Sequence, residues 1–153
     1  MDKSRRPDLA AMLFPLGRAL IAIEEPILTT NGLSMWAYAV LLGLGDEPVR
    51  TQAALASAIG ADKSRLIPVL DDLQDRGLIT RRPDPADRRV RLVRITPEGR
   101  RLRDRTQASI QRAEERLLEV LSPGDRQAFV RTLHALHESV RAADPAASPP
   151  SGD

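Results

Sequence analysis

The sequence predicts a mainly α-helical protein that carries one small β-hairpin. Two observations favour this fold class: both ends of the chain repeat apolar residues at helical spacing, and two short apolar runs near the middle flank a polar turn. The 153 residues are 42% apolar and 29% charged, which is typical of one globular domain. We expect a flexible arm over residues 1–7, a single domain over 8–143 and a disordered tail over 144–153.

The first helix is expected from Asp8 to about Leu28. Its apolar residues alternate at spacings of four and three, which is typical of a helix that packs along a partner helix. Pro15 has no backbone N–H, so we expect a kink or a broken first turn there. The apolar positions of this seam are Leu9, Leu13, Leu16, Leu20, Ile23 and Ile27.

A second helix is expected from Ser34, as its N-cap, to about Leu44, before a stop signal at 45–48. The segment 26–45 holds twenty residues without a formal charge, which is long enough to span a bilayer. The polar turn at 29–32 interrupts this segment and leaves too short an apolar piece on either side. We therefore expect a corner between two helices and no membrane segment.

Residues 52–70 contain two short helical patterns joined at Gly60, which predicts a helix-turn-helix. Ala56 is the small residue at the helix crossing, and Gly60 tolerates the positive φ of a tight turn. Asp62 is expected to cap the second helix, whose first turn then presents two cations and a hydroxyl. Such helix pairs also occur in proteins that do not bind DNA. The expected shared core is Leu55, Ile59, Leu66, Val69, Leu70 and Leu73.

A β-hairpin is expected directly after that helix pair. Leu78–Thr80 predicts one strand and Val90–Ile95 the other, with Val93 and Ile95 facing the core. The turn at 81–89 contains two prolines that stiffen it and an Asp two residues before an Arg, which the Asp can orient. An Arg at such a tip suits the narrow, negative minor groove of duplex DNA. A solvated charged hairpin is the alternative.

Two more helices are expected in the last third of the chain. Thr96 and Pro97 form a good start, and the segment 122–125 breaks the helix before the next begins. The seams at both ends of the chain exceed what one chain of this size easily buries, so we expect a homodimer, with an intramolecular bundle as the alternative. The apolar positions are Leu102, Ile110, Ala113, Leu117, Val120 and Leu121, then Phe129, Leu133, Leu136 and Val140.

Charge is unevenly distributed, although the formal net charge is only +2. Residues 50–112 hold 15 Lys or Arg and 8 Asp or Glu, a net +7, whereas the rest of the chain has a net charge of −5. Aromatic residues make up 3%, which argues against a stacking platform for single strands and leaves duplex DNA as the expected partner. The sequence contains no cysteine, which excludes disulfides, thiolate metal sites and thiol redox chemistry.

With these motifs the sequence resembles the MarR family of winged helix-turn-helix transcriptional regulators. The resemblance rests on Gly77-Leu78-Ile79, Asp84-Pro85-Ala86-Asp87-Arg88-Arg89 and Ile95-Thr96-Pro97-Glu98-Gly99, in the order and spacing of the family. It implies a winged helix-turn-helix over about 34–99, flanked by dimerisation helices over about 8–31 and 100–143. It further implies an obligate dimer that binds a pseudo-palindromic operator, and we expect a repressor.

The resemblance also assigns roles to single residues. Arg89 would enter the minor groove and Asp87 would hold it, while Pro68 departs from the family pattern by removing the amide bond to the carbonyl of Ser64. Family members often bind small aromatic or phenolic ligands between the dimerisation helices and the winged helix. Met35, Trp36 and Tyr38 would line such a cleft, with core packing as their alternative role. The candidate DNA-binding residues are Lys63, Ser64, Arg65, Arg81, Arg82, Asp87, Arg88 and Arg89.

Two other function classes compete with this interpretation. His134, His137 and Glu138 share a helix face that would hold a metal weakly, but no nucleophilic Cys, Gly-rich phosphate loop or paired carboxylate supports an enzyme. A helical adaptor that never touches DNA is the second alternative, and it would not need the six Arg between Arg81 and Arg94. We therefore expect a cytoplasmic DNA-binding regulator with no enzymatic activity, metal or cofactor.

Overall fold

A computed structural model describes residues 6–45 and 49–143 of the chain. The expected fold class is confirmed, because these residues are mostly helical and carry a small antiparallel sheet. Residues 1–5 of the expected arm, residues 46–48 of the expected helix stop and the expected tail at 144–153 lie outside the described residues. The elements are α1 (Leu9–Thr30), α2 (Met35–Gly43), β1 (Val49–Thr51), α3 (Gln52–Ile59), α4 (Lys63–Asp75), β2 (Ile79–Pro83), β3 (Arg91–Ile95), α5 (Pro97–Leu118) and α6 (Pro123–Ala143).

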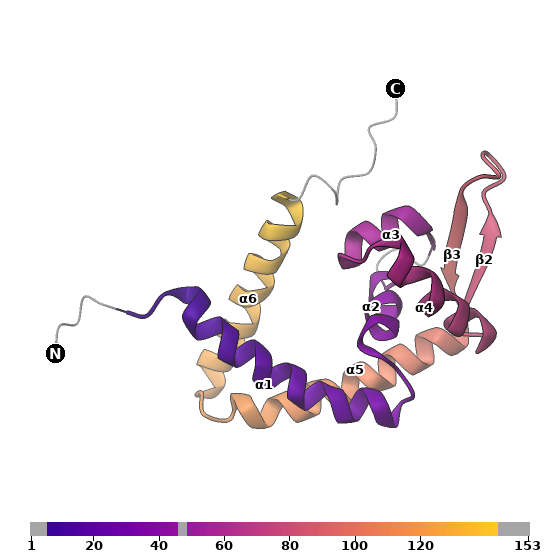
Figure 1. Cartoon of the computed structure of the whole chain (residues 1–153). Helices are drawn as coiled ribbons and strands as arrows, with labels where there is room; N and C mark the ends of the chain where they lie inside the picture. The colour runs from indigo at the N-terminus through magenta and orange to yellow at the C-terminus, as the bar shows by residue number, and fades with distance from the viewer. Residues whose placement is uncertain (1–5, 46–48, 144–153) are drawn as a thin grey trace.

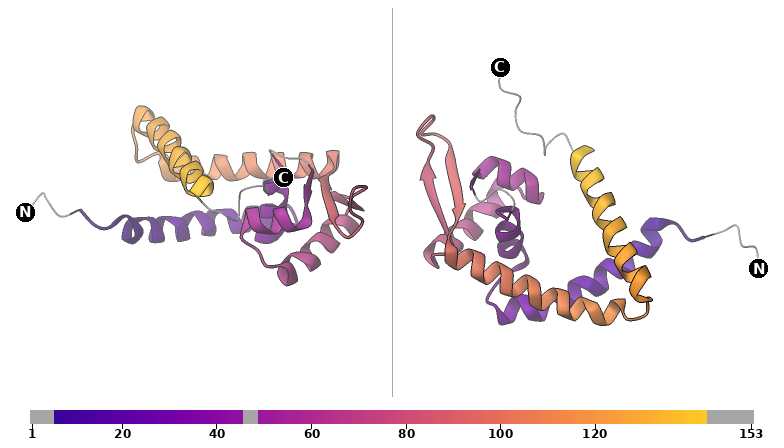
Figure 2. Two further views of the ribbon diagram at one scale, coloured as in Figure 1. Left: turned by 90° about the horizontal axis from the view of Figure 1, so that it is seen from above. Right: turned by 180° about the vertical axis from the view of Figure 1, so that it is seen from behind.

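Two parts of the described chain are joined by α5 (Figure 1). At one end of α5, the helices α2, α3 and α4 gather beside the sheet, and the hairpin of β2 and β3 projects outward. Along the rest of α5, the helix α1 lies at its side, and α6 turns back from its far end (Figures 1 and 2). None of the described helices combines the length and the apolar content that crossing a bilayer requires.

The core lies where α2, α3 and α4 meet the sheet and α5. Four of the six residues expected to share the helix-turn-helix core are buried, and Ile59 and Val69 pack against them at partial exposure. Val93 and Ile95 are buried on the inner face of β3, as their alternation predicted. In contrast, α6 buries no residue within this chain. The buried four are Leu55, Leu66, Leu70 and Leu73.

The helix starts expected from sequence are confirmed by their capping bonds. The Ser34 hydroxyl accepts the N–H of Ala37 at 3.1 Å, and the Asp62 carboxylate accepts the N–H of Arg65 at 2.8 Å. Such bonds satisfy backbone donors that have no partner inside the helix. Gly60 ends α3 with a φ of 69°, which is the left-handed conformation expected in the turn of the helix-turn-helix.

The sheet is larger than the expected hairpin. Its strand order is β1-β3-β2, and β1 pairs with β3 through Arg50 opposite Val93. Three residues are too few to show an alternating pattern, so β1 carries no periodic signal in the sequence. The strand β2 also runs on to Pro83, so Arg81 and Arg82 lie in the strand and the expectation that they belong to the turn is wrong.

The first helix runs unbroken through Pro15 and Pro26, so a broken first turn is wrong, and a kink at Pro15 stays a prediction. Each proline removes one amide donor, and the turns on either side keep their own hydrogen bonds. At the start of the helix, the N–H of Met12 donates to the carbonyl of Asp8 at 3.2 Å. This helix therefore reaches continuously from its exposed end to the corner before α2.

The junction of Thr96 and Gly99 connects the sheet, the end of α4 and the start of α5. The Thr96 hydroxyl donates to the carbonyl of Gly77 at 2.7 Å and accepts the N–H of Gly99 at 3.0 Å. The Thr96 N–H donates to the carbonyl of Leu78 at 3.1 Å. A Cβ atom on Gly99 would lie 2.1 Å from that same Leu78 oxygen, so only glycine fits here. The Thr-Pro-Glu-Gly motif therefore marks the point where the hairpin is fastened to α5.

We expect Gly99→Ala to lower the free energy of unfolding by about 3 kcal/mol, since the added methyl group meets rigid backbone in a buried site. Urea denaturation followed by circular dichroism measures the change. Gly124→Ala is the matched control, because a Cβ there meets nothing within 4 Å. The control should stay within about 0.5 kcal/mol of the wild type. Equal stability of Gly99→Ala and wild type would contradict the close packing at this junction.

Candidate nucleic-acid interface

The first turn of α4 carries three of the candidate DNA contacts. Lys63, Ser64 and Arg65 are all exposed and follow the N-cap Asp62. The Ser64 hydroxyl donates to the Asp62 carboxylate at 2.6 Å, and this bond and that from the Arg65 N–H hold the pKa of Asp62 below its usual range. The hydroxyl donor of Ser64 is therefore engaged in the cap, and its oxygen is free to act as an acceptor.

Pro68 does not break the recognition-helix candidate. The helix α4 runs from Lys63 to Asp75 through this proline, which lies exposed on its surface beside the partly exposed Ile67. The buried residues Leu66 and Leu70 face the core from the opposite side. The amide bond that Pro68 removes therefore leaves the helix and its packing in place.

Two carboxylates in the second half of α4 are paired with arginines that follow them in the chain. Arg76 lies 3.3 Å from Asp72 and also donates to the carbonyl of Gly32 at 2.8 Å, which connects the end of α4 to the corner between α1 and α2. Arg81, on β2, pairs with Asp71. These pairs neutralise two carboxylates of α4 and hold the end of the helix between two neighbouring elements.

Arg81 is placed differently from the expectation. Besides its ion pair with Asp71, its Nε donates to Gln74 at 2.6 Å, and its side chain is only 18% exposed. The sequence predicted a DNA contact, but within the folded chain this guanidinium fastens the hairpin to α4. Arg82, its neighbour in β2, is exposed. Successive residues of a strand point to opposite faces, which separates Arg81 from Arg82. A turn has no such alternation, so the sequence interpretation did not distinguish the two arginines.

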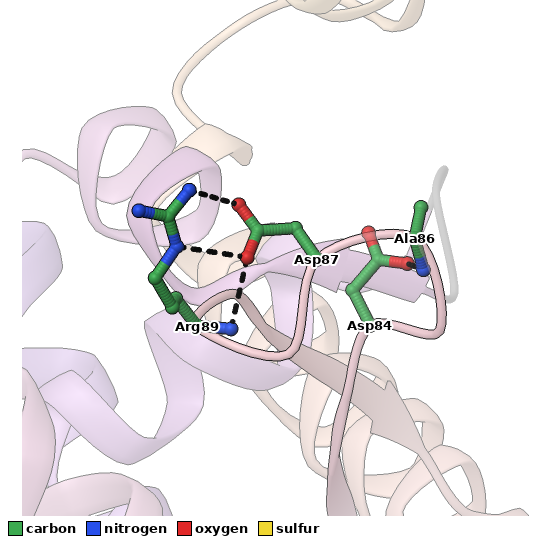
Figure 3. Close-up of polar contacts among 4 residues, drawn as sticks. All are labelled: Asp84, Ala86, Asp87 and Arg89. Carbon is green, nitrogen blue, oxygen red and sulfur yellow. Dashed lines mark hydrogen bonds and ion pairs between the residues drawn. The ribbon is translucent and has the colours of Figure 1, made fainter.

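The tip of the hairpin holds Arg89 in a fixed orientation. Its Nε and one terminal nitrogen donate to the two carboxylate oxygens of Asp87 at 3.0 and 3.1 Å, and its backbone N–H donates to the same carboxylate at 3.1 Å (Figure 3). On the same turn, the Asp84 carboxylate accepts the N–H of Ala86 at 2.9 Å. These bonds lower the pKa of Asp87 and raise that of Arg89. The Asp and Arg pairing inferred from the spacing is thus present in the folded chain.

The orientation of Arg89 leaves its charge available to a partner. Its side chain is 91% exposed although it is bound at two points by Asp87. Two-point pairing restricts the rotamers of a long side chain without burying it. Arg88, beside it, is also exposed. The hairpin tip therefore presents one oriented arginine and one unrestrained neighbour.

A cavity of about 330 Å³ brings the helix-turn-helix and the hairpin together. Lys63 from α4 and Arg89 from the hairpin both line it, as does Arg91 at the start of β3. Arg91 was not among the sequence candidates. It lies on the same face of β3 as Val93 and Ile95, at the exposed end of the strand, so strand alternation could have identified it. The remaining lining residues are Thr51, Gln52, Ala53 and Val90.

The ligand-cleft candidates lie in three different settings on α2. Tyr38 is buried in the core at 6% exposure, and burial, with smaller effects from Glu24 and Glu114, raises its pKa to about 12, so its phenol stays neutral. Met35 is exposed, and Trp36 is partly buried with its ring against Arg65. Tyr38 therefore belongs to the core, and the other two residues lie at the surface of α2.

The metal candidates on α6 remain separate from this interface. His134, His137 and Glu138 are exposed, and Nδ1 of His137 lies 3.4 Å from a Glu138 oxygen. Among residues 6–45 and 49–143, no group of three or more His, Asp or Glu side chains is arranged to hold a metal ion.

Comparison with known proteins adds independent findings. A family profile described as the MarR family matches residues 31–90. A putative transcriptional regulatory protein for the hcr operon of Thauera aromatica is 31% identical over 128 residues, covering 81% of this chain and 77% of that protein. A MarR-family regulator from Rhodococcus sp. RHA1 superposes with a TM-score of 0.72 at 29% identity, over 86% of this chain and 96% of its own. CouR from Rhodococcus jostii RHA1, solved with p-coumaroyl-CoA, has a TM-score of 0.68 at 31% identity, over 84% and 91% of the two chains.

We expect Arg81→Ala to lower the free energy of unfolding by about 1 kcal/mol, since a charged hydrogen-bonding group between β2 and α4 is lost at a partly solvated site. Arg82→Ala, on the adjacent exposed position, should leave stability within about 0.5 kcal/mol of the wild type. Urea denaturation of both variants measures the difference. An unchanged stability of Arg81→Ala would mean that this arginine does not fasten the hairpin.

Proposed function

The chain belongs to the MarR family of transcriptional regulators, a non-enzymatic family. From this premise we propose that it is a cytoplasmic repressor that binds a pseudo-palindromic operator as a homodimer. The observation that carries the proposal is the two-point pairing of Asp87 with the exposed Arg89 at the tip of the hairpin. The Arg89 side chain is 91% exposed, so its charge stays available to a polyanion while its orientation is fixed. A helical adaptor would have no use for an oriented arginine beside a helix-turn-helix.

The arrangement of charges fits one half of a DNA site. The first turn of α4 would present Lys63 and Arg65 to the major groove, and Arg89 at the tip of the hairpin would reach the adjacent minor groove. Lys63, Arg89 and Arg91 border one cavity, which suits a backbone phosphate between the two grooves. Phosphate contacts of this kind fix the register of a protein on the duplex.

The unpartnered apolar faces support the homodimer. Leu9, Leu13 and Phe14 are exposed on α1, and Leu136 and Val140 are exposed on α6, where Val140 reaches 72% exposure. Contiguous apolar faces that stay exposed on a folded chain are typical of a protein–protein interface. An apolar hollow of about 460 Å³ separates α1, α5 and α6 and gives a partner helix a place to insert. A two-fold dimer would then present two winged helices to two half-sites.

We extend the proposal to a small aromatic or phenolic effector that releases the protein from DNA. The relative CouR is described with p-coumaroyl-CoA bound, which supports an aromatic ligand class for this chain. Met35 and Trp36, at the surface of α2, would contact such a ligand between the dimerisation helices and the winged helix. Tyr38 lies deeper and would contribute its neutral phenol only if the ligand reached the core.

Operator binding tests the role of the hairpin. Selection from random duplexes supplies the operator, whose symmetry and half-site spacing also report on the dimer. At one fixed salt concentration, Arg89→Ala should weaken binding by about 1 to 3 kcal/mol. Asp87→Ala should weaken it as well, because the loss of the orienting bonds outweighs the loss of a negative charge beside a polyanion.

The sign of the Asp87→Ala effect decides between two descriptions of the hairpin. On charge grounds alone, removing a carboxylate tightens binding to DNA. Tighter binding by Asp87→Ala, with the fold intact by circular dichroism, would make the hairpin a nonspecific basic patch. Arg88→Ala is the matched comparison, since Arg88 neighbours Arg89 without being held by Asp87. It should cost less than Arg89→Ala.

The homodimer is tested by a charge on the seam of α6. Leu133 is 42% exposed within the single chain, so Leu133→Asp leaves the fold of the protomer intact while placing an unpaired carboxylate in the proposed interface. We expect this variant to sediment as a monomer of 16.8 kDa at a concentration at which the wild type sediments as a dimer. Thr80→Asp, on the exposed part of β2, should remain dimeric. A monomeric wild type at micromolar concentration would contradict the dimer.

A further inference from the structure

We propose that Trp36 is a positioning residue for Arg65 and that, through Arg65, it sets a preference for guanine in the operator half-site. The proposal rests on the DNA-binding function proposed above. It starts from one contact: the central carbon of the Arg65 guanidinium lies over the Trp36 ring, 5.4 Å from its centroid. Trp36 belongs to the first turn of α2 and Arg65 to the first turn of α4, so the contact joins two elements that are separate in the sequence.

The type of contact leaves the arginine free to read a base. A cation–π contact uses the charge of the guanidinium and takes up none of its N–H groups as hydrogen-bond donors. Arg76 and Arg81, in contrast, donate to carboxylates, so some of their N–H groups are already hydrogen-bonded within the chain. Arg65 is exposed, and its contact with Trp36 orders the side chain. Its N–H groups therefore remain available to a base.

Both ends of Arg65 are ordered before any DNA is bound. Its backbone N–H donates to the Asp62 carboxylate at 2.8 Å, which fixes the start of α4. Its guanidinium is placed by Trp36, which is partly buried on a helix whose own start is fixed by Ser34. A side chain that is already ordered loses less conformational entropy when it binds, so Trp36 contributes to affinity without touching the DNA.

The base follows from the geometry of the donor edge. An arginine fork at the N-terminal end of a recognition helix matches the O6 and N7 acceptors of guanine in the major groove. The first turn of α4 therefore favours a guanine at the position that Arg65 reaches.

Operator affinities at one salt concentration test the coupling between the two residues. Against the selected operator, Arg65→Ala should weaken binding about 10- to 100-fold. Trp36→Leu should weaken it about 2- to 5-fold, and Trp36→Phe should restore most of that loss because it keeps an aromatic face. The double variant of Trp36→Leu with Arg65→Ala should bind no more weakly than Arg65→Ala alone. Additive losses in the double variant would overturn the proposal.

A single-atom change in the DNA separates positioning from general structural damage. Each guanine of the operator is replaced in turn by 7-deazaguanine, which lacks the N7 acceptor. One replacement per half-site should weaken the wild type, have no effect on Arg65→Ala and have a reduced effect on Trp36→Leu. A general loss of structure would lower all affinities. It would leave the ratio of the affinities for the guanine and 7-deazaguanine operators as in the wild type.

The contact itself is tested without DNA. Trp36 is the sole tryptophan of the chain, so its fluorescence reports on Arg65 directly. Its emission in the free protein should change in Arg65→Ala, and it should change on operator binding in the wild type. Trp36→Leu with wild-type affinity and a wild-type 7-deazaguanine ratio would overturn this inference while the DNA-binding function stands. Failure of the wild type to select any duplex would overturn both, whereas an intact fluorescence difference would still establish the contact.

Discussion

The close approach of α5 to the end of α4, at Gly99 and Leu78, is the constraint on which the remaining architecture depends. The Thr96 hydroxyl bonds to both sides of this junction, and the absence of a side chain at Gly99 lets the backbones meet. Because β3 ends and α5 begins here, the direction of the hairpin is set relative to the long helix. A change at this point would therefore alter the position of the hairpin relative to the far end of α5, where α6 follows.

Four arginines of the basic middle segment illustrate two different roles. Arg76 and Arg81 pair with carboxylates of α4 and connect that helix to its neighbours. Arg65 and Arg89 are held by a ring face and by a carboxylate, and both remain exposed. Net charge alone would assign all of them to the DNA. In the folded chain, Arg76 and Arg81 neutralise carboxylates of α4, whereas Arg65 and Arg89 remain exposed.

Much of this arrangement was predictable from the sequence because it is local. The caps at Ser34 and Asp62 and the turn at Gly60 are confirmed, since each depends on residues only two or three positions apart. The pairing of Asp87 with Arg89 belongs to the same class. Each of these features is set by short-range backbone geometry, which a sequence pattern describes directly.

The features that the sequence did not reveal depend on tertiary packing. Arg81 points to α4 because the register of β2 places it there, and the contact of Trp36 with Arg65 requires two helices to be brought together. The strand β1 is too short for a pattern and exists because β3 offers it a partner edge. The helix α1 continues through Pro15 because the surrounding turns hold it, which a rule for isolated helices underestimates.

The helix α6 buries no side chain within its own chain, and this bears on the lifetime of the protein. An amphipathic helix of 21 residues that buries none of its side chains is only marginally stable in water and opens often. A protomer without a partner would therefore offer proteases an accessible site at one end, whereas a covered α6 would be protected. Degradation would then fall fastest on the unpaired protomers, and the steady-state amount of the protein would be linked to its own assembly.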